Sequence, residues 1–328
     1  MKPYLLSILS PMALLFPAIL NAGPHQLPGR QDIDQLISAS DLVIKGVVKE
    51  VRRRDGKPEV VLLDVKKIYK GAEPGSATVE VYIKSASDLC AIPEVGSSML
   101  AFAKTEAGKV IASDCPRDIW AAPRKQGSKN ASQSPAAALE SDLRAALKEP
   151  DRKDVIAAIR QLGNLKAKSA REEIKPLLKS DDPDIQAMAV RSLLKLGDYS
   201  GLSRVAWLQG KKFDEWLILA EINSSISSLD DKQAVPALIP LTKSPNDAVV
   251  RSALDALRNI KSPEATQSLI ELLDHGNPDI RFSALMTLTD IEPKVMEDAP
   301  GRDLYMASPD KYAKVWKEWW TNKKKGRK

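Results

Sequence analysis

The side chains that most often carry out chemistry in proteins, histidine and cysteine, are scarce in this sequence. It contains two of each, His25 and His275, and Cys90 and Cys115. A Ser-His-Asp or Cys-His nucleophilic site would need one of these histidines, and neither lies in a supporting motif. The sequence also contains no H-E-x-x-H zinc motif and no glycine-rich phosphate loop. We therefore expect a protein that is not an enzyme and that binds no cofactor or catalytic metal.

The two cysteines have a structural interpretation and a functional one. In an exported protein, Cys90 and Cys115 would form one disulfide. The alternative, a redox or metal-binding pair, lacks the C-x-x-C spacing and nearby histidines. We favour the disulfide.

Export is predicted from residues 1–22. Lys2 precedes an apolar run over residues 4–20, which Pro11 and Pro17 interrupt. This composition is typical of a cleaved secretory signal peptide, with processing near Ala22; an uncleaved N-terminal anchor is the alternative. The expected location is periplasmic or secreted, and no transmembrane segment is expected after cleavage.

The carboxylates are numerous, but many stand where helices begin. Polar-proline-polar turns occur at residues 182–184, 244–247 and 277–279. A side-chain oxygen there can cap open amides, and proline is tolerated in the first helical turn. Capping accounts for these carboxylates, and nothing marks a pair of them as catalytic.

These helix starts belong to a repeat. Apolar or equivalent residues recur at positions 154, 185, 216, 249 and 280, and small residues four positions later, at 158, 189, 220, 253 and 284. A period of 31 to 33 residues predicts about five helix pairs over residues 139–292. We place the first helices of these pairs at residues 139–148, 170–179, 199–209, 234–242 and 263–273.

The repeated segments resemble HEAT repeats, in particular the short bacterial type described with phycobilisome-lyase-like proteins. The matching residues are PDIQAMAVRSLLKLG at 183–197, AVVRSALDALRNI at 248–260 and NPDIRFSALMTL at 277–288. The resemblance implies an α-solenoid whose second helices line a concave surface. It supplies a scaffold shape, and the bilin chemistry of a few members cannot be transferred to residues here.

Eight residues on the second helices are candidates for binding a partner on this surface. They are Gln186, Arg191, Lys195, Arg251, Asp255, Arg258, Arg281 and Phe282. The alternative is structural: Arg281 would pair with aspartates of neighbouring turns, and the others would form a solvated face. Trp207 and Trp216, in the middle repeat, are expected in the core.

Residues 31–122 have a different, alternating pattern. After a short amphipathic helix, it predicts strands over residues 42–51, 59–69, 77–83, 99–104 and 109–115, separated by glycine-containing turns. Five short strands favour a small closed barrel. SDLVIKGVV at 40–48, DVKKIYKG at 64–71 and GSSMLAFA at 96–103, with Cys90 and Cys115, resemble the OB-like barrel of tissue-inhibitor-of-metalloproteinase (TIMP) and netrin-like domains. In that inhibitor family an N-terminal cysteine engages the protease metal, and this chain has none near residue 23.

Two further segments complete the domain organisation. Residues 123–138, rich in proline, serine, glycine and charge, are predicted to be a flexible linker. Residues 293–328 contain a helix beginning near Ser308, with Tyr312, Val315, Trp316 and Trp319 on one face, and a basic end over residues 323–328. We expect this helix to cap the solenoid and the basic end to be disordered, with possible weak contacts to acidic envelope components.

The net charge of +6 does not indicate nucleic-acid binding. Residues 306–328 alone carry +6, so the rest of the chain is nearly balanced. The sequence thus predicts an OB-like β-barrel followed by an all-α HEAT-type solenoid, acting as an exported, non-catalytic protein-binding or scaffold protein. The alternatives are a regulator or inhibitor of an exported hydrolase acting through the barrel, and a carbohydrate or envelope-polymer binder using Trp316 and Trp319.

Overall fold

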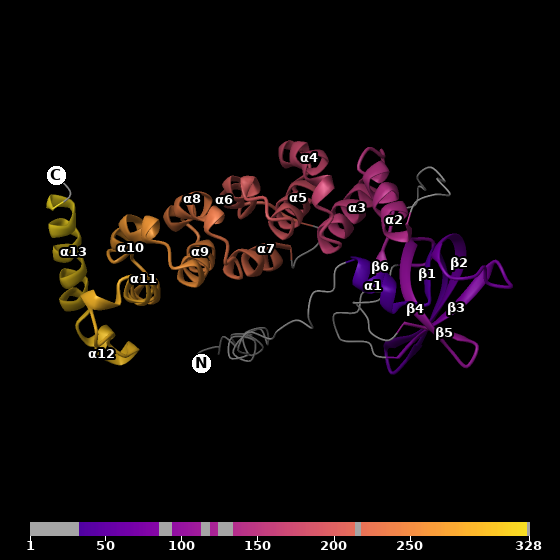
Figure 1. The fold of residues 1–328 in the computed structure, drawn as a ribbon, viewed down its shortest axis with the longest axis horizontal. Coiled ribbons are helices and arrows are strands. Elements are labelled where there is room, and N and C mark those ends of the chain that lie inside the picture. Colours follow the sequence, from indigo (N-terminus) through magenta and orange to yellow (C-terminus); the bar gives the residue numbers. More distant parts are fainter. Residues whose placement is uncertain (1–32, 85–93, 113–118, 124–133, 214–217, 327–328) are drawn as a thin grey trace, which may run out of the picture.

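The computed structural model describes residues 33–84, 94–112, 119–123, 134–213 and 218–326. A β-barrel is followed by a row of paired helices, as the sequence predicted (Figure 1). The predicted signal peptide and both cysteines lie outside the described residues, so the signal and the disulfide stay predictions.

The barrel is a closed sheet of five strands. Strands β1, β2, β3, β5 and β4 are neighbours in that order, and pairing of β4 with β1 closes the barrel. Only the β3–β5 pair of this described sheet is parallel, and β6 adds to the free edge of β4. The OB-like barrel is thereby confirmed. Its elements are α1 (Ile33–Ala39), β1 (Leu42–Arg54), β2 (Lys57–Lys70), β3 (Thr78–Ile83), β4 (Ser98–Glu106), β5 (Lys109–Ala112) and β6 (Ile119–Ala121).

Both faces of the barrel wall are buried where β1 meets β4. Ile44 and Met99 belong to the core inside the barrel, whereas Val43, Leu100 and Phe102 belong to a core shared with the helices. Successive side chains of a strand point to opposite faces, so one strand can serve two cores. This explains why the first seven residues of β1 are almost all buried.

The solenoid consists of A helices, on its upper side in Figure 1, and B helices on its lower side. The A helices are α2 (Pro135–Ala146), α4 (Arg171–Ile174), α6 (Val205–Leu208), α8 (Val235–Leu238) and α10 (Thr266–Leu272). Short 3-10 helices extend all of them except α2. They are η2 (Lys168–Ala170) and η3 (Lys175–Lys179) around α4, η4 (Ser200–Arg204) before α6, η5 (Lys232–Ala234) and η6 (Ile239–Lys243) around α8, and η7 (Pro263–Ala265) before α10. The B helices are α3 (Arg152–Asn164), α5 (Pro183–Lys195), α7 (Ile218–Ser227), α9 (Asp247–Ile260) and α11 (Pro278–Ile291).

The B helices begin at the capping residues that the sequence indicated. Asp182 accepts hydrogen bonds from the backbone N of Asp184 and Ile185, and Asn246 and Asn277 cap α9 and α11 in the same way. Each cap satisfies amides that the first helical turn leaves open. The turns therefore fix where each B helix starts, and with it which side chains face the core.

The repeat register predicted for the middle pair is wrong by two residues. Ala220 was predicted to share the position of Ala158, Ala189, Ala253 and Ala284, which are buried, but it is exposed, and Ile218, Ile222 and Ile226 are buried instead. The extra residues of this repeat therefore precede α7 and do not follow it. With this correction the equivalent positions in the first turns of the B helices are 154, 185, 218, 249 and 280. Trp216 lies outside the described residues, and Trp207 is exposed and not in the core.

The predicted linker is partly helical, because α2 begins at Pro135, with Ser134 as its N-cap. Residues 124–133 lie outside the described residues. Leu139 and Leu143 of α2 share a core with Val43 and Phe102 of the barrel. The barrel thus covers the end of the solenoid that would otherwise expose the first repeat, which is what a capping unit must do.

The other end is covered by α12 (Arg302–Ala307) and α13 (Pro309–Lys325), which follow η8 (Pro293–Val295). Trp316 is fully buried, while Trp319 and Trp320 are half-buried against the same core. The expectation of a disordered basic end is wrong for residues 323–325, which extend α13. Lys323 pairs with Glu292 and lies 4.4 Å from the Trp319 ring centroid, so packing and charge hold this turn in place.

In the part of the chain that the structure describes, none of the helices combines the length and the apolar character needed to cross a bilayer.

Candidate functional site

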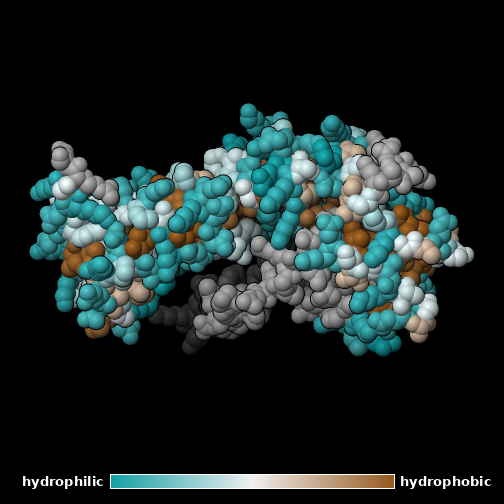
Figure 2. All heavy atoms as spheres, in the orientation of Figure 1, coloured by the Kyte–Doolittle hydropathy of each residue, from teal (hydrophilic) through white to brown (hydrophobic). Residues whose placement is uncertain are grey.

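The B helices present one continuous face to solvent, which we call the concave face. Figure 2 shows that the lower outline of the molecule recedes between the C-terminal helices and the barrel, on the side of the B helices. On α7 the outward residues are the short Ala220 and Ser224, and the equivalent positions of α9 are Arg251 and Asp255. The face thus changes from small to charged side chains between neighbouring helices.

The eight candidate residues fall into three groups by exposure. Arg251, Asp255 and Arg258 are exposed on α9; Lys195, Arg281 and Phe282 are half-buried; Gln186 and Arg191 are buried, with 2% and 8% of their surface exposed. The three exposed residues are directly available to a partner on the concave face.

Gln186 and Arg281 occupy the same position in α5 and α11, and both bind the turn before their own helix. The Gln186 amide donates to the Ser180 carbonyl at 2.6 Å, and Arg281 donates to the His275 carbonyl at 2.8 Å. Both side chains therefore stabilise the turn that precedes their own helix. The predicted pairing of cations with aspartates of neighbouring turns occurs at other residues: Arg302 binds Asp279, and Arg152 binds Asp182 and Asp184.

Other candidates connect adjacent repeats. Arg191 pairs with Glu221 of α7, and Lys195 donates to Asn164 of α3 at 2.7 Å. Arg258 bonds Asp290 of α11 at 2.6 Å. A charged or polar partner on an adjacent repeat holds each side chain in one geometry. The concave face is therefore a set of positioned charges on a stiff support.

The pKa of the Asp255 carboxyl is shifted upward. Desolvation by neighbouring atoms raises the pKa of this carboxyl although the residue is exposed overall, while a hydrogen bond from Ser227 and the charges of Arg258 and Arg251 act in the opposite direction. Desolvation disfavours the charged form of a carboxyl group.

A pocket of about 360 Å³ lies where the concave face meets the barrel, and we call it the junction pocket. Met188 and Ile218 are buried in its walls, and Ala121 of β6 closes one end. Its full lining is Ala121, Arg152, Lys153, Ile156, Ala157, Arg160, Asp184, Met188 and Ile218. The candidates chosen from the sequence missed it. The spacing of Lys153, Ile156, Ala157 and Arg160 on one helix was the available signal.

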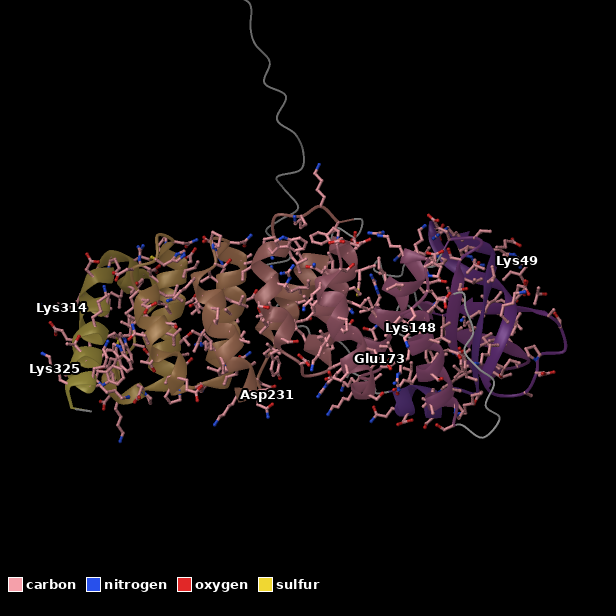
Figure 3. The ribbon with its side chains drawn as sticks, turned by 90° about the horizontal axis from the view of Figure 1, so that it is seen from above. Lys49, Lys148, Glu173, Asp231, Lys314 and Lys325 are labelled. Carbon is pink, nitrogen blue, oxygen red and sulfur yellow. The ribbon has the colours of Figure 1, made fainter. Side chains whose placement is uncertain are left out.

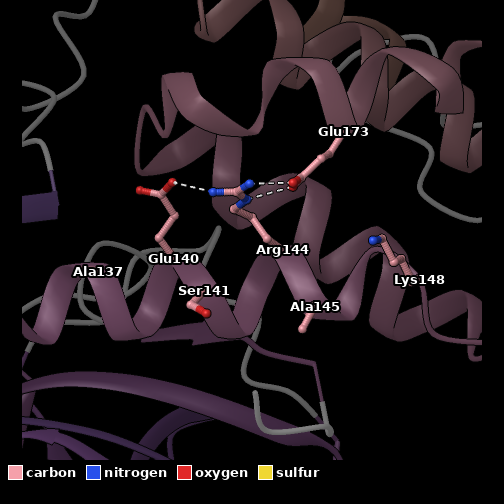
Figure 4. Close-up of a pocket in the computed structure, with 7 residues that line it drawn as sticks. All are labelled: Ala137, Glu140, Ser141, Arg144, Ala145, Lys148 and Glu173. Carbon is pink, nitrogen blue, oxygen red and sulfur yellow. Dashed lines mark hydrogen bonds and ion pairs between the residues drawn. The ribbon is translucent and has the colours of Figure 1, made fainter. Parts of the chain in front are cut away.

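A second hollow of about 500 Å³ lies on the A-helix side, between α2 and α4 (Figure 4). Arg144 at its centre bonds Glu173 through two nitrogens, at 2.5 and 2.8 Å, and lies 4.0 Å from Glu140. Its charges are therefore largely matched within the protein. Lys148, at the rim, stands apart from this group in Figure 4, and Figure 3 shows where Lys148 and Glu173 lie along the solenoid.

The barrel is fixed to the first helix pair by a buried charge network. Asp142 of α2, 3% exposed, accepts hydrogen bonds from Lys67 at 2.7 and 2.8 Å and from the Tyr69 hydroxyl at 2.6 Å. Burial and the bond to Asp142 raise the pKa of Tyr69 well above its usual range. Lys45 of β1, 2% exposed, lies near Asp142 and Asp154. The network holds the barrel in one orientation against the first helix pair.

Lys45 should make stability depend on pH. Burial lowers its pKa from 10.5 to about 8 in the folded chain. Between these values the unfolded chain holds a proton that the folded chain has lost, so stability rises with pH. From pH 7.5 to 9.5 we expect the unfolding free energy of the wild type to gain roughly 1–2 kcal/mol relative to Lys45→Met. Denaturant titrations would measure this, and parallel pH curves would refute it. Above pH 10, ionisation of unfolded Tyr69 opposes the gain.

A family comparison agrees with this architecture. The profile of HEAT repeats matches residues 140–210 and 211–289. Residues 140–289 are HEAT repeats. The matched HEAT region begins within α2 and ends within α11, so it spans the described B helices and leaves out the barrel and α13. HEAT and armadillo repeat folds are commonly used for protein binding or scaffolding.

Several solved structures are similar to about half of this chain. The complex of CpcE and CpcF of phycocyanin lyase from Nostoc sp. PCC7120 is 19% identical over 52% of this chain and 68% of that chain, with a TM-score of 0.35. An archaeal HEAT-like repeats protein from Thermococcus onnurineus NA1 is 13% identical over 55% and 87%, with a TM-score of 0.34. A designed armadillo repeat protein in complex with the peptide (KR)4 is 18% identical over 48% and 82%, with a TM-score of 0.33. A search of curated proteins finds no significant match.

The groups considered for chemistry are placed as follows. His275 lies in the turn before α11, where its Nδ1 accepts a hydrogen bond from the backbone N of Asn277 at 3.1 Å. His25 lies outside the described residues. Among the residues that the structure describes, no group of three histidine, cysteine or acidic side chains is arranged to hold a metal ion.

Proposed function

We propose that the protein is an exported, non-catalytic scaffold whose concave face binds a protein partner. The observation that carries the proposal is the concave face itself. Arg251, Asp255 and Arg258 are exposed on α9 beside the short outward residues of α7, and an ion pair with Asp290 of the next repeat holds Arg258 in place. A preorganised surface loses little side-chain entropy when a partner binds.

The proposal of export depends on the sequence of residues 1–22. It is tested by determining the N-terminal residue of the purified protein. We expect the chain recovered from the envelope or medium to begin near Gly23. A chain that keeps Met1 and stays in the cytoplasm would refute this part of the proposal.

The geometry favours the scaffold over the two alternatives. An inhibitor acting through the barrel alone would need an independent barrel, whereas Val43 and Phe102 share a core with α2. A polymer-binding platform needs open aromatic faces, whereas Trp316 is buried and the Trp320 indole donates to Gln267 of α10 at 2.7 Å.

Capture of a partner from the envelope fraction tests the scaffold function. The bait is the full mature chain, and the variants are Ser224→Arg and Arg251→Glu, which change size and charge on the concave face. Ser203→Arg and Lys243→Glu make the same changes on exposed A-helix turns. We expect one protein to be captured by the wild type and both controls and lost from both concave variants. Equal capture by all five baits would contradict the proposal.

A further inference from the structure

The helix α13, which caps the solenoid, has two different faces. One face packs on the solenoid, where Trp316 is fully buried and Trp319 and Trp320 are half-buried. The other face carries exposed residues at helical spacing, and we call it the outer face of α13. It consists of Lys311, Lys314, Val315, Glu318, Asn322 and Lys325. This face is about 20 Å long, measured along the helix axis.

The lysines of the outer face lie at the extreme end of the molecule. Figure 3 shows Lys314 and Lys325 at this end, beside α13. The Lys314 side chain is 74% exposed and lies 3.8 Å from Glu318 of the same face, and the Lys311 ammonium lies 5.5 Å from the Tyr312 ring centroid. An exposed ion pair one helical turn apart contributes little energy, so these ammonium groups remain available to an external anion.

The end of the molecule is positively charged even when every carboxylate of this region is counted. Residues 292–328 contain ten lysines and arginines against six aspartates and glutamates, an excess of four positive charges. Asp274, from outside this region, binds Lys317 at 2.5 Å, which leaves an excess of three. The count includes Arg327 and Lys328, which follow the described residues. It comes from the sequence, so it does not depend on how any single side chain is paired.

The composition of the outer face suits a broad anionic surface better than a single anionic group. Its cations are all lysines, which act as compact point charges, whereas arginine is preferred for bidentate binding of one carboxylate. Val315, 40% exposed, follows Lys314, and the lysine stems add apolar surface around it. A lysine-rich helical face of this kind is typical of peripheral attachment to anionic lipid headgroups.

We infer that the outer face of α13 binds the surface of an anionic phospholipid membrane. Lys311, Lys314 and Lys325 would lie among the headgroups. The tryptophans of α13 pack on the solenoid, so the attachment would be electrostatic and the helix would not insert. The solenoid would then be held by one end, with its concave face available to the protein partner. The inference goes beyond the proposed function, because it gives the scaffold a place at a membrane whichever protein it binds.

Sedimentation with lipid vesicles tests the inference on the full mature chain. The vesicles are phosphatidylcholine with about one third phosphatidylglycerol, and pure phosphatidylcholine is the neutral comparison. We expect saturable binding to the anionic vesicles, lost at high salt, and no binding to the neutral ones. Lys311→Gln, Lys314→Gln and Lys325→Gln combined should weaken binding about a hundredfold, which corresponds to roughly 3 kcal/mol.

The matched control removes the same charge from exposed lysines at the A helices. Lys148→Gln, Lys179→Gln and Lys232→Gln combined should change the affinity for anionic vesicles less than about threefold, because charges far from the surface are screened. The residues replaced in both triple variants are exposed, so both proteins should keep the wild-type unfolding midpoint, which circular dichroism measures.

Three results would overturn the inference. They are absence of binding to anionic vesicles, equal weakening by the two triple variants, and equally tight binding to neutral vesicles. Binding to soluble poly-glutamate without binding to vesicles would also overturn it, because the outer face would then recognise an acidic polymer. The scaffold function fails on a different result, since capture through Ser224 and Arg251 is measured without lipid.

Discussion

Replacing Asp142 with alanine is expected to lower the free energy of unfolding by about 3–5 kcal/mol, because it breaks a buried ion pair on one side only. Lys67 would keep its charge, and the Tyr69 hydroxyl would lose its acceptor, in a layer that water does not reach easily. Nearby Lys45 would also lose a compensating negative charge. Urea unfolding of the full chain, followed by circular dichroism, measures the effect.

Two variants show whether the cause is the unpaired charge. Tyr69→Phe removes one hydrogen bond from the same carboxylate and should cost only about 1 kcal/mol. Lys67→Met combined with Asp142→Leu removes both charges of the pair and should recover most of the loss. If Asp142→Ala costs less than Tyr69→Phe, the network does not hold the barrel against the helices.

Replacing Trp316 with alanine should destabilise the opposite end of the solenoid by about 3–5 kcal/mol, because it empties the site of a fully buried indole. In a solenoid each repeat contacts mainly its neighbours, so the loss should be local. Hydrogen exchange should therefore quicken in α10, α11 and α13 while α3 and the barrel strands stay protected.

Val315→Ala is the matched control for Trp316, because Val315 precedes it in the same helix and is 40% exposed. This variant should change stability by less than about 0.5 kcal/mol. Uniform loss of protection along the whole chain in Trp316→Ala would contradict a local cap and would indicate that the solenoid unfolds as a single unit.

The two ends of the solenoid are thus capped by two unrelated structures. At one end a barrel shares its wall with the first helix pair; at the other a helix buries an indole. Removing the barrel would expose Leu139 and Leu143, so we do not expect the helices to behave as an independent module.

The helix pairs were predictable because their apolar positions repeat in phase and their capping residues recur in the turns. The middle repeat was misplaced for a related reason. Ala220 matched the small residues of its neighbours by type, but the sequence before α7 is two residues longer than in the other repeats, and Ile222 takes the buried position. Residue type alone cannot locate an insertion within a repeat. The helical end of α13 was missed because the Lys323 contact with Glu292 is distant in sequence.

The candidate site was less predictable than the fold. Gln186 and Arg281 are polar residues on the expected helices, yet their side chains turn back to carbonyls of the preceding turn. Arg191 is covered by α7, which no pattern within α5 can reveal. The junction pocket needs β6 placed against α3, a contact between residues 40 positions apart. Periodicity identifies helical faces, whereas pockets form between them.

Site-specific photo-crosslinking tests most directly the central claim, that the concave face binds the partner. A photoreactive residue is placed at Ala220, Ser224 or Asp255 on the concave face, and at Glu172 or Glu264 on exposed A-helix positions. We predict that the partner crosslinks to the three concave positions and not to the two A-helix positions. Crosslinks confined to Glu172 and Glu264 would contradict the account.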